Sequence, residues 1–186
     1  MHGPSAHNGW IELVCGPMFS GKTEELIRRL RRAQIAKQRV AIFKPRIDDR
    51  YSDSYIVSHT QMKLESYIID DPKEILNLSY DAHAIGIDEA QFFDERLIPI
   101  CRKMAIGGKR VIVAGLDKDY RGLPFGSMPL LMTEAEYVTK LLSICVKCGN
   151  PANFSQRIST DSQTVVVGET DKYEARCRRC YEGHDA

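Results

Sequence analysis

The sequence predicts an α/β fold, in which helices flank a parallel sheet and a small metal-binding domain follows. Short apolar runs alternate with helix-like runs over most of the chain, as is typical of a parallel sheet covered on both faces. A glycine-rich loop at 16–23 follows the first apolar run. Two Cys-x-x-Cys pairs stand near the C-terminal end, at 145–148 and 177–180. These three observations predict the fold class.

Length and composition limit the classes of function. The 186 residues suffice for one main domain with a small appendage, and 43% apolar residues allow a buried core. The formal charge of +1 gives no strong field to attract nucleic acid, and no apolar run approaches the ~20 residues that cross a bilayer. Residues 1–9 are polar and lack the apolar core of a secretory signal. We expect a cytoplasmic protein with neither a nucleic-acid nor a membrane partner.

The first predicted strand, at 10–15, leads into a phosphate-binding loop. The loop fits the pattern G-x-x-x-x-G-K-[ST], and a helix-like run at 24–38 follows it. In this setting backbone N–H groups face the phosphates, Lys22 reaches the β and γ oxygens, and the Thr23 hydroxyl can ligate Mg²⁺. An ordinary glycine turn is the alternative, but the flanking strand and helix favour a nucleoside triphosphate site. Its residues are Gly16, Pro17, Met18, Phe19, Ser20, Gly21, Lys22 and Thr23.

The next elements are a strand, a polar loop, a possible strand and a helix start. The apolar run at 40–44 predicts a strand, and the polar stretch at 46–61 lacks clear periodicity and predicts a loop. Residues 64–69 are compatible with a further strand. Asp71-Pro72 then has the form of a helix start.

Two short β-branched runs complete the predicted sheet. The runs at 84–88 and 110–114 are of the kind buried inside parallel sheets. The residues between them predict a helix at 95–105 that ends at Gly107-Gly108. The sequence therefore predicts helices on both faces of one parallel sheet.

Two adjacent carboxylates, Asp88 and Glu89, stand at the end of a predicted buried strand. An Asp in this position commonly holds the Mg²⁺ of a bound nucleotide, although it can also cap the next helix. Glu89 leaves the sheet in another direction and can orient or deprotonate an attacking oxygen. If that oxygen belongs to water the protein is an NTPase, and if it belongs to a substrate hydroxyl the protein is a kinase. The pair alone does not decide between them.

The four paired cysteines predict a structural zinc site of four thiolates, which leaves no open position for zinc catalysis. The intervening segment, 149–176, is longer than in a compact zinc ribbon, so the metal would join the ends of a long loop. A redox Cys-x-x-Cys is the alternative, which two matched copies disfavour. The segment is too small for its own core and would depend on the metal. The predicted ligands are Cys145, Cys148, Cys177 and Cys180.

A pocket for a flat ring is predicted beyond the strand ends. Aromatic and apolar residues gather there, where open α/β sheets bind ligands, although such residues are often simply core. The stretch 164–168 could read a base edge through its main chain, or form a plain hairpin. The residues after the strand ends are Phe92, Phe93, Leu116, Tyr120 and Phe125.

Taken in order, GPMFSGKT, KPRIDDRY, IDEAQFF, GLDKDYRGLPFG and DKYEARCRRC resemble the type II thymidine kinases of cells and bacteria, from about Ile11 to Tyr181. The resemblance implies a RecA-like sheet with a C-terminal zinc-binding lasso domain, a segment that closes over the base. It implies phosphorylation of the thymidine 5′-hydroxyl by ATP in nucleotide salvage, with Mg²⁺ and structural zinc, in a homotetramer. The implied parts are a tail at 1–9, a kinase domain at 10–143, the lasso domain at 144–182 and a tail at 183–186.

The resemblance also implies roles for individual residues. Glu89 would be the general base, and Thr23 and Asp88 would hold the magnesium. The ATP site would add Asp48, Asp49, Arg50, Asp88, Glu89, Ala90 and Gln91 to the glycine-rich loop. The nucleoside site would comprise Met18, Phe92, Leu116, Tyr120, Phe125, Ser155, Thr164, Val165, Val166, Val167, Gly168 and Tyr173.

The chain departs from the family pattern at two of these regions. Tyr120 stands where many relatives have Phe, and Glu169 stands where relatives often have a small residue.

Two other functions remain open from the residues alone. The first is a zinc-containing P-loop NTPase stimulated by nucleic acid, which the near-neutral charge disfavours. The second is a non-catalytic nucleotide sensor. Formation of a nucleoside monophosphate would distinguish the kinase from both.

Overall fold

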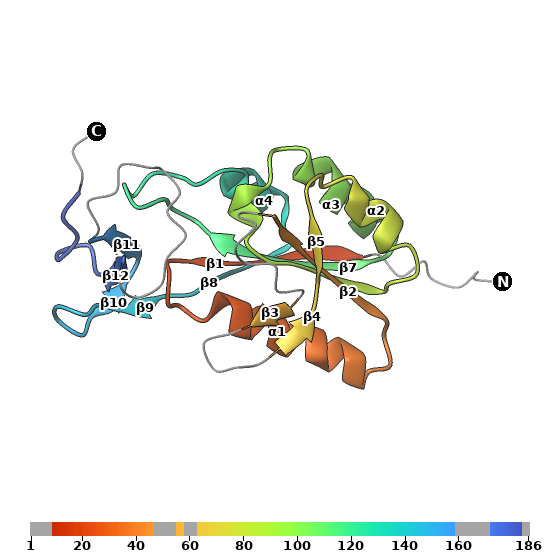
Figure 1. The fold of residues 1–186 in the computed structure, drawn as a ribbon, viewed down its shortest axis with the longest axis horizontal. Coiled ribbons are helices and arrows are strands. Elements are labelled where there is room, and N and C mark those ends of the chain that lie inside the picture. The colour runs from red at the N-terminus through yellow and green to blue at the C-terminus, as the bar shows by residue number, and fades with distance from the viewer. Residues whose placement is uncertain (1–8, 47–54, 58–62, 159–171, 184–186) are drawn as a thin grey trace.

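The computed structural model describes residues 9–46, 55–57, 63–158 and 172–183. Its centre is a six-stranded sheet with the order β5-β2-β6-β7-β1-β8, in which all neighbouring strands are parallel (Figure 1). This order confirms the predicted parallel α/β fold. The strands are β1 (Trp10–Gly16), β2 (Val40–Pro45), β5 (Tyr67–Ile69), β6 (Ala84–Ile87), β7 (Arg110–Leu116) and β8 (Tyr137–Lys140).

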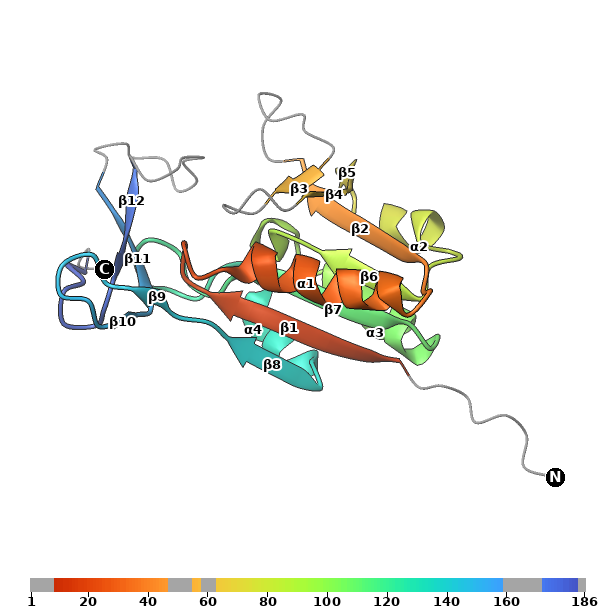
Figure 2. The same cartoon turned by 90° about the horizontal axis from the view of Figure 1, so that it is seen from below.

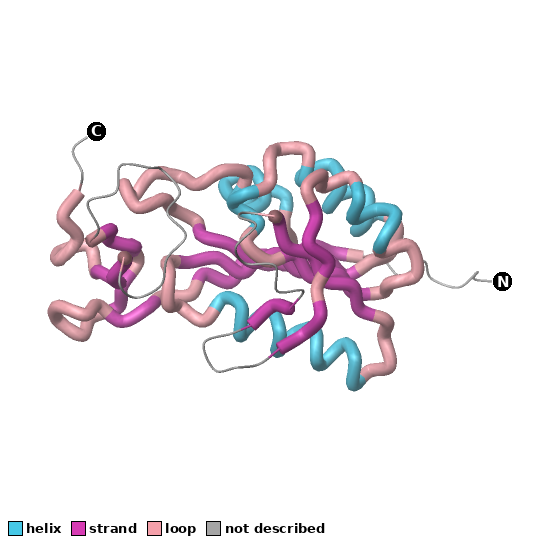
Figure 3. The backbone as a smooth tube through the Cα atoms, viewed as in Figure 1, coloured by secondary structure: helices cyan, strands magenta, loops and turns pink. Residues whose placement is uncertain are grey.

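Helices cover both faces of this sheet, as Figure 3 shows. The helix α1 (Lys22–Ile35) lies on one face, where its Leu26, Ile27 and Leu30 pack with apolar side chains of the central strands. The other face carries α2 (Glu74–Leu78), α3 (Leu97–Ile106) and α4 (Met128–Glu134). Each face therefore has its own hydrophobic core.

The region after β2 differs from the sequence prediction. The strand expected at 64–69 is two short strands, β4 (Lys63–Glu65) and β5, because they pair with different partners. β4 pairs antiparallel with β3 (Tyr55–Val57), so the loop predicted at 46–61 was wrong at 55–57. The helix expected after Asp71-Pro72 begins at Glu74, after a turn in which Asp71 Oδ1 accepts the backbone N–H of Lys73 at 3.0 Å.

A buried carboxylate joins α1 to the sheet. Glu12, in β1, is 6% exposed and accepts hydrogen bonds from Trp10 Nε1 (2.7 Å), Arg110 Nε (2.6 Å) and Arg29 Nη1 (2.8 Å). Burial alone would raise the pKa of Glu12, but these donors outweigh it and lower that pKa. Arg29, in α1, also donates to Thr139 in β8. Ion pairs thus connect α1 with β1 and β7, and a hydrogen bond extends this network to β8.

The C-terminal part lies beyond the carboxyl ends of the sheet strands, as Figure 2 shows. It contains two small antiparallel sheets, which pair β9 (Ser143–Ile144) with β10 (Pro151–Ala152), and β11 (Phe154–Arg157) with β12 (Tyr173–Arg176). Its apolar cluster consists of Cys145, Ala152, Ala175 and Cys177. Among the described residues this core is small, which agrees with the prediction that a metal stabilises this part.

Within the described part of the chain, no helix combines the length and the apolar character needed to cross a membrane.

Candidate functional site

The loop between β1 and α1 wraps around the start of the helix. Gly16, Phe19 and Gly21 have positive φ angles of 147°, 62° and 82°. The Ser20 hydroxyl donates to the carbonyl of Pro17 at 2.8 Å and closes the turn. The loop therefore bends back over the N-terminus of α1, where helix N–H groups form an anion-binding site.

Lys22 is positioned across this loop. Its Nζ donates to the Pro17 carbonyl at 2.7 Å. Burial lowers the pKa of Lys22, while the charges of Glu89 and Asp88 raise it. The ammonium group thus stands between the loop and two carboxylates, where it can bind phosphate oxygens.

Asp88 follows the end of β6 and faces the first turn of α1. Its Oδ2 accepts a hydrogen bond from the Thr23 hydroxyl at 3.1 Å, and the residue is only 6% exposed. Burial, and then the charge of Glu89, raise the pKa of Asp88 to about 7. A hydroxyl and a buried carboxylate are oxygen ligands of the type that Mg²⁺ takes, and a cation would relieve the repulsion between the two carboxylates. The residues therefore fit the predicted magnesium.

Glu89 has an unusual backbone conformation, with φ 52° and ψ 40°. Non-glycine residues in this left-handed region are uncommon and cluster at functional sites. Gln91 Nε2 donates to Glu89 Oε2 at 2.5 Å, and Gln91 Oε1 accepts the backbone N–H of Leu116 at 2.9 Å. The buried Gln91 thus ties the Glu89 carboxylate to the end of β7. Ala90 is fully buried beside it.

Four of the aromatic residues predicted for the base pocket form two groups, whereas Phe93 is buried in the hydrophobic core. Phe92 and Phe125 meet edge to face with ring centroids 5.5 Å apart. Tyr120 and Tyr173 are joined by Arg157, whose guanidinium carbon lies 3.7 Å from the Tyr120 ring centroid and whose Nη2 donates to the Tyr173 hydroxyl at 2.8 Å.

Arg157 is a residue that the sequence analysis missed. It is 6% exposed, in β11, two residues after the predicted pocket residue Ser155. Because side chains i and i+2 share one face of a strand, that spacing is the signal that could have found it.

Two further predicted residues meet across 137 positions of the chain. The backbone N–H of Met18, in the glycine-rich loop, donates to the Ser155 hydroxyl at 3.0 Å. This contact brings the C-terminal part against the phosphate loop. The predicted residues Asp48, Asp49, Arg50, Thr164, Val165, Val166, Val167 and Gly168 lie outside the described residues.

The four paired cysteines converge as predicted. Their sulfur atoms all lie within 4.8 Å of one another, and Cys148 Sγ is 3.6 Å from the sulfurs of both Cys177 and Cys180. A tetrahedral zinc with Zn–S bonds of about 2.3 Å separates its sulfurs by about 3.8 Å, so the cluster fits this metal. Burial raises the pKa of the Cys145 thiol, but backbone N–H groups, Cys177 first, outweigh it and lower that pKa to about 6.

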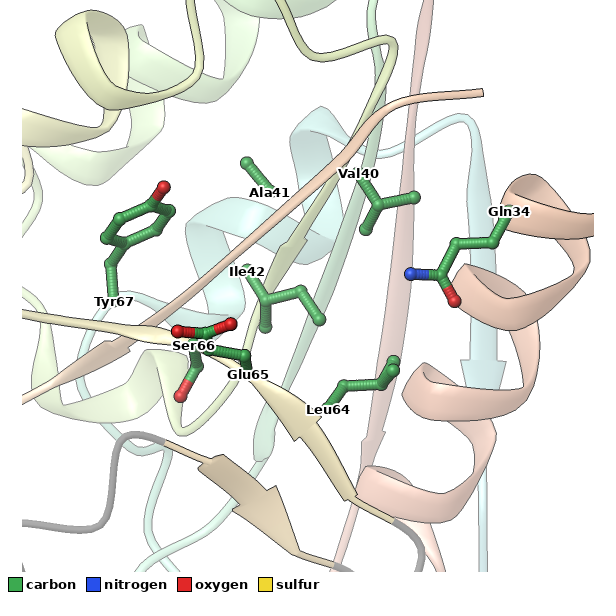
Figure 4. A pocket seen from close by; sticks show the side chains of 8 residues that line it. All are labelled: Gln34, Val40, Ala41, Ile42, Leu64, Glu65, Ser66 and Tyr67. Atoms are coloured by element: carbon green, nitrogen blue, oxygen red, sulfur yellow. The ribbon is translucent and has the colours of Figure 1, made fainter. Parts of the chain in front are cut away.

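A separate hollow lies between α1, β2 and the β4–β5 segment (Figure 4). Gln34 lines it, 12 residues after Lys22 and so about 18 Å along the helix axis. None of the predicted site residues lines this hollow, which is lined by Gln34, Val40, Ala41, Ile42, Leu64, Glu65, Ser66 and Tyr67.

Fold and site together define an α/β P-loop nucleotide-binding protein with a cluster of four cysteines that fits a metal ion. A glycine loop, a half-buried lysine and a strand-end Asp-Glu pair meet at the carboxyl ends of the parallel strands. This arrangement serves phosphoryl transfer or hydrolysis.

Comparison with known proteins identifies the family. The family model described as thymidine kinase matches residues 9–181. The chain is 58% identical over 181 residues to a thymidine kinase of Rhodothermus sp. (strain ITI 518), covering 97% of this chain and 84% of that protein. It is 53% identical over 174 residues to the thymidine kinase of Bacteroides fragilis (strain YCH46), covering 94% and 87%. The chain belongs to the thymidine kinase family.

Proposed function

We propose that this protein transfers the γ-phosphoryl group of ATP to the 5′-hydroxyl of thymidine. Family membership supports both the reaction and the substrates. The observation that carries the mechanism is the fixed carboxylate of Glu89, which Gln91 holds beside Asp88 and the phosphate loop.

In this proposal the phosphate loop and Lys22 bind the ATP phosphates. Thr23 and Asp88 hold the magnesium, which neutralises charge on the β and γ oxygens. Glu89 accepts the proton of the 5′-hydroxyl and orients that oxygen for in-line attack. Further contacts to ATP are proposed from the family resemblance alone, for Asp48, Asp49 and Arg50.

The nucleoside would bind between the strand ends and the C-terminal part. Phe92 and Phe125 offer apolar ring faces, while Arg157 holds Tyr120 and Tyr173 in place. A hydrophobic pocket gains only about 1–3 kcal/mol from one methyl group, so rejection of cytidine-type nucleosides must depend on hydrogen bonds at the base edge. The stretch 164–168 remains the proposed source of those bonds.

The resemblance also supports zinc in the cysteine cluster, a homotetramer and a cytoplasmic location. Zinc has support from the fit of the four sulfurs. Interacting helices would contribute to the tetramer.

The test is an assay of the purified protein with ATP·Mg²⁺ and a panel of nucleosides, followed for monophosphate formation. We expect thymidine monophosphate as the main product. ADP release that requires DNA or RNA and yields no monophosphate would identify the nucleic-acid-stimulated NTPase instead, which the family membership does not favour. Tight ATP binding without turnover on any nucleoside would identify a sensor.

A further inference from the structure

The segment 140–143, which runs from the last residue of β8 to the first residue of β9, lies against the start of the phosphate loop. The backbone N–H of Leu141 donates to the Cys15 carbonyl at 2.8 Å. The Ser143 hydroxyl donates to the Phe19 carbonyl at 3.1 Å. Lys140 Nζ forms an ion pair of 2.7 Å with Asp117 Oδ2, and Asp117 directly follows β7. β1, the strand that leads into the phosphate loop, lies between β7 and β8. The ion pair therefore joins the ends of the two strands on either side of β1.

The contact between this segment and the loop is close. A Cβ atom on Gly16 would lie 2.4 Å from the Leu141 carbonyl oxygen, nearer than real atoms approach, so the two backbones touch there. Phe19 has a left-handed φ of 62°, which costs a non-glycine residue free energy. Because Ser143 binds the carbonyl of Phe19, it stabilises the conformation that the loop needs.

The same segment leads directly into the cysteine cluster. Ser143 begins β9, and the zinc ligand Cys145 follows two residues later. The side chain of Phe19 packs on the apolar cluster that contains Cys145 and Cys177. The phosphate loop thus contacts both the segment and the metal-binding part to which it leads.

We infer that Ser143 is a positioning residue for the phosphate loop, and that the segment 140–143 makes the affinity for ATP·Mg²⁺ depend on the metal-bound cysteines. The inference rests on the proposed function, because ATP is taken as the ligand of the loop.

The test measures equilibrium binding of ATP·Mg²⁺ without nucleoside, by calorimetry on the zinc-loaded protein. Loss of one buried hydrogen bond predicts that Ser143→Ala binds ATP·Mg²⁺ about threefold to tenfold more weakly, with its zinc content unchanged. Ser143→Thr keeps the hydroxyl and should restore most of the affinity. Ser79→Ala is the matched control, since Ser79 is also buried but its hydroxyl donates to a methionine sulfur at 3.9 Å and lies outside the segment 140–143. Lys140→Met, which removes the ion pair, should weaken binding in the same direction.

A second arm removes the zinc with a chelator and repeats the titration on wild type and Ser143→Ala. Chelation should weaken ATP binding more in wild type than in Ser143→Ala. The variant has already lost the hydrogen bond from residue 143 to Phe19, which links the phosphate loop to the cysteine cluster. Wild-type affinity in Ser143→Ala, or an equal effect of chelation in both proteins, would overturn the inference alone. A wild-type protein that does not bind ATP·Mg²⁺ would overturn the proposed function as well.

Discussion

Thr23 and Asp88 stand 65 positions apart in the chain, and the Thr23 hydroxyl donates to Asp88 Oδ2 over 3.1 Å. The bond joins the first turn of α1 to the end of β6, so the helix that follows the phosphate loop is fixed against the carboxylates. Asp88 Oδ1 meanwhile accepts the backbone N–H of Glu89 at 3.0 Å. Asp88 thus orients residues on both sides of the site.

Asp88→Asn should lower turnover and raise the magnesium concentration that half-maximal activity requires. The amide keeps the shape but loses the charge that attracts a divalent cation, and loss of even an outer-shell partner of a metal typically costs about 10–100-fold in metal affinity or activity. Turnover measured over a range of Mg²⁺ concentrations checks this. Asp81→Asn, at an exposed position, is the control. An unchanged magnesium requirement in Asp88→Asn would remove this residue from the metal site.

Glu89→Gln should reduce turnover by about 10²–10⁴, because the amide cannot accept the proton of the 5′-hydroxyl. Binding of ATP should change little, since Lys22 and the loop remain intact. Steady-state kinetics combined with ATP titration separate the two effects, and Glu95→Gln, at an exposed position, serves as the control. Near-normal turnover in Glu89→Gln would disprove the role of general base.

Cys148→Ser should release the metal and destabilise the C-terminal part, because four thiolates would bind that metal and the described residues of this part form only a small core. Metal analysis and thermal unfolding of the purified variant test this. Cys101→Ala should retain the metal, since Cys101 lies in α3 and is buried in the hydrophobic core between that helix and the sheet. If the Cys148→Ser protein keeps one zinc per chain, the prediction that four cysteines bind the zinc is wrong.

Glu12→Gln should destabilise the protein by about 3 kcal/mol at neutral pH, because it leaves Arg29 and Arg110 without their buried partner. The pKa of Glu12 in the folded protein lies below its ordinary 4.5. Its contribution to stability is therefore present above pH 4.5 and is lost as the pH falls through the folded-state pKa.

Denaturant unfolding from pH 3 to pH 7 measures this contribution. The difference in unfolding free energy between wild type and Glu12→Gln should shrink toward the acidic end. A difference that stays constant over the whole range would mean that the network does not depend on the charge of Glu12.

Local patterns predicted the parts of the site that are contiguous in sequence. The phosphate loop, the Asp88-Glu89 pair and the two cysteine pairs each combine a short spacing with the end of a predicted strand or with a chemically specific ligand set. Each of these motifs is defined by a few residues that are neighbours in the chain, so the sequence alone is sufficient to recognise it.

Contacts between distant segments were not predictable in the same way. The pairing of Arg157 with Tyr120, or of Ser155 with Met18, depends on how the C-terminal part packs on the sheet. β3 was missed because the polar run 46–61 lacks periodicity, and its strand is defined by pairing with β4. The register of that pairing is a tertiary property, which single-sequence periodicity does not contain.

Trp10 is the only tryptophan of the chain, and its indole N–H donates to Glu12. The protein therefore has an intrinsic fluorophore at one known place, on the first strand of the sheet. Its emission gives a label-free optical signal for the opening of the surrounding network, and no other indole contributes background.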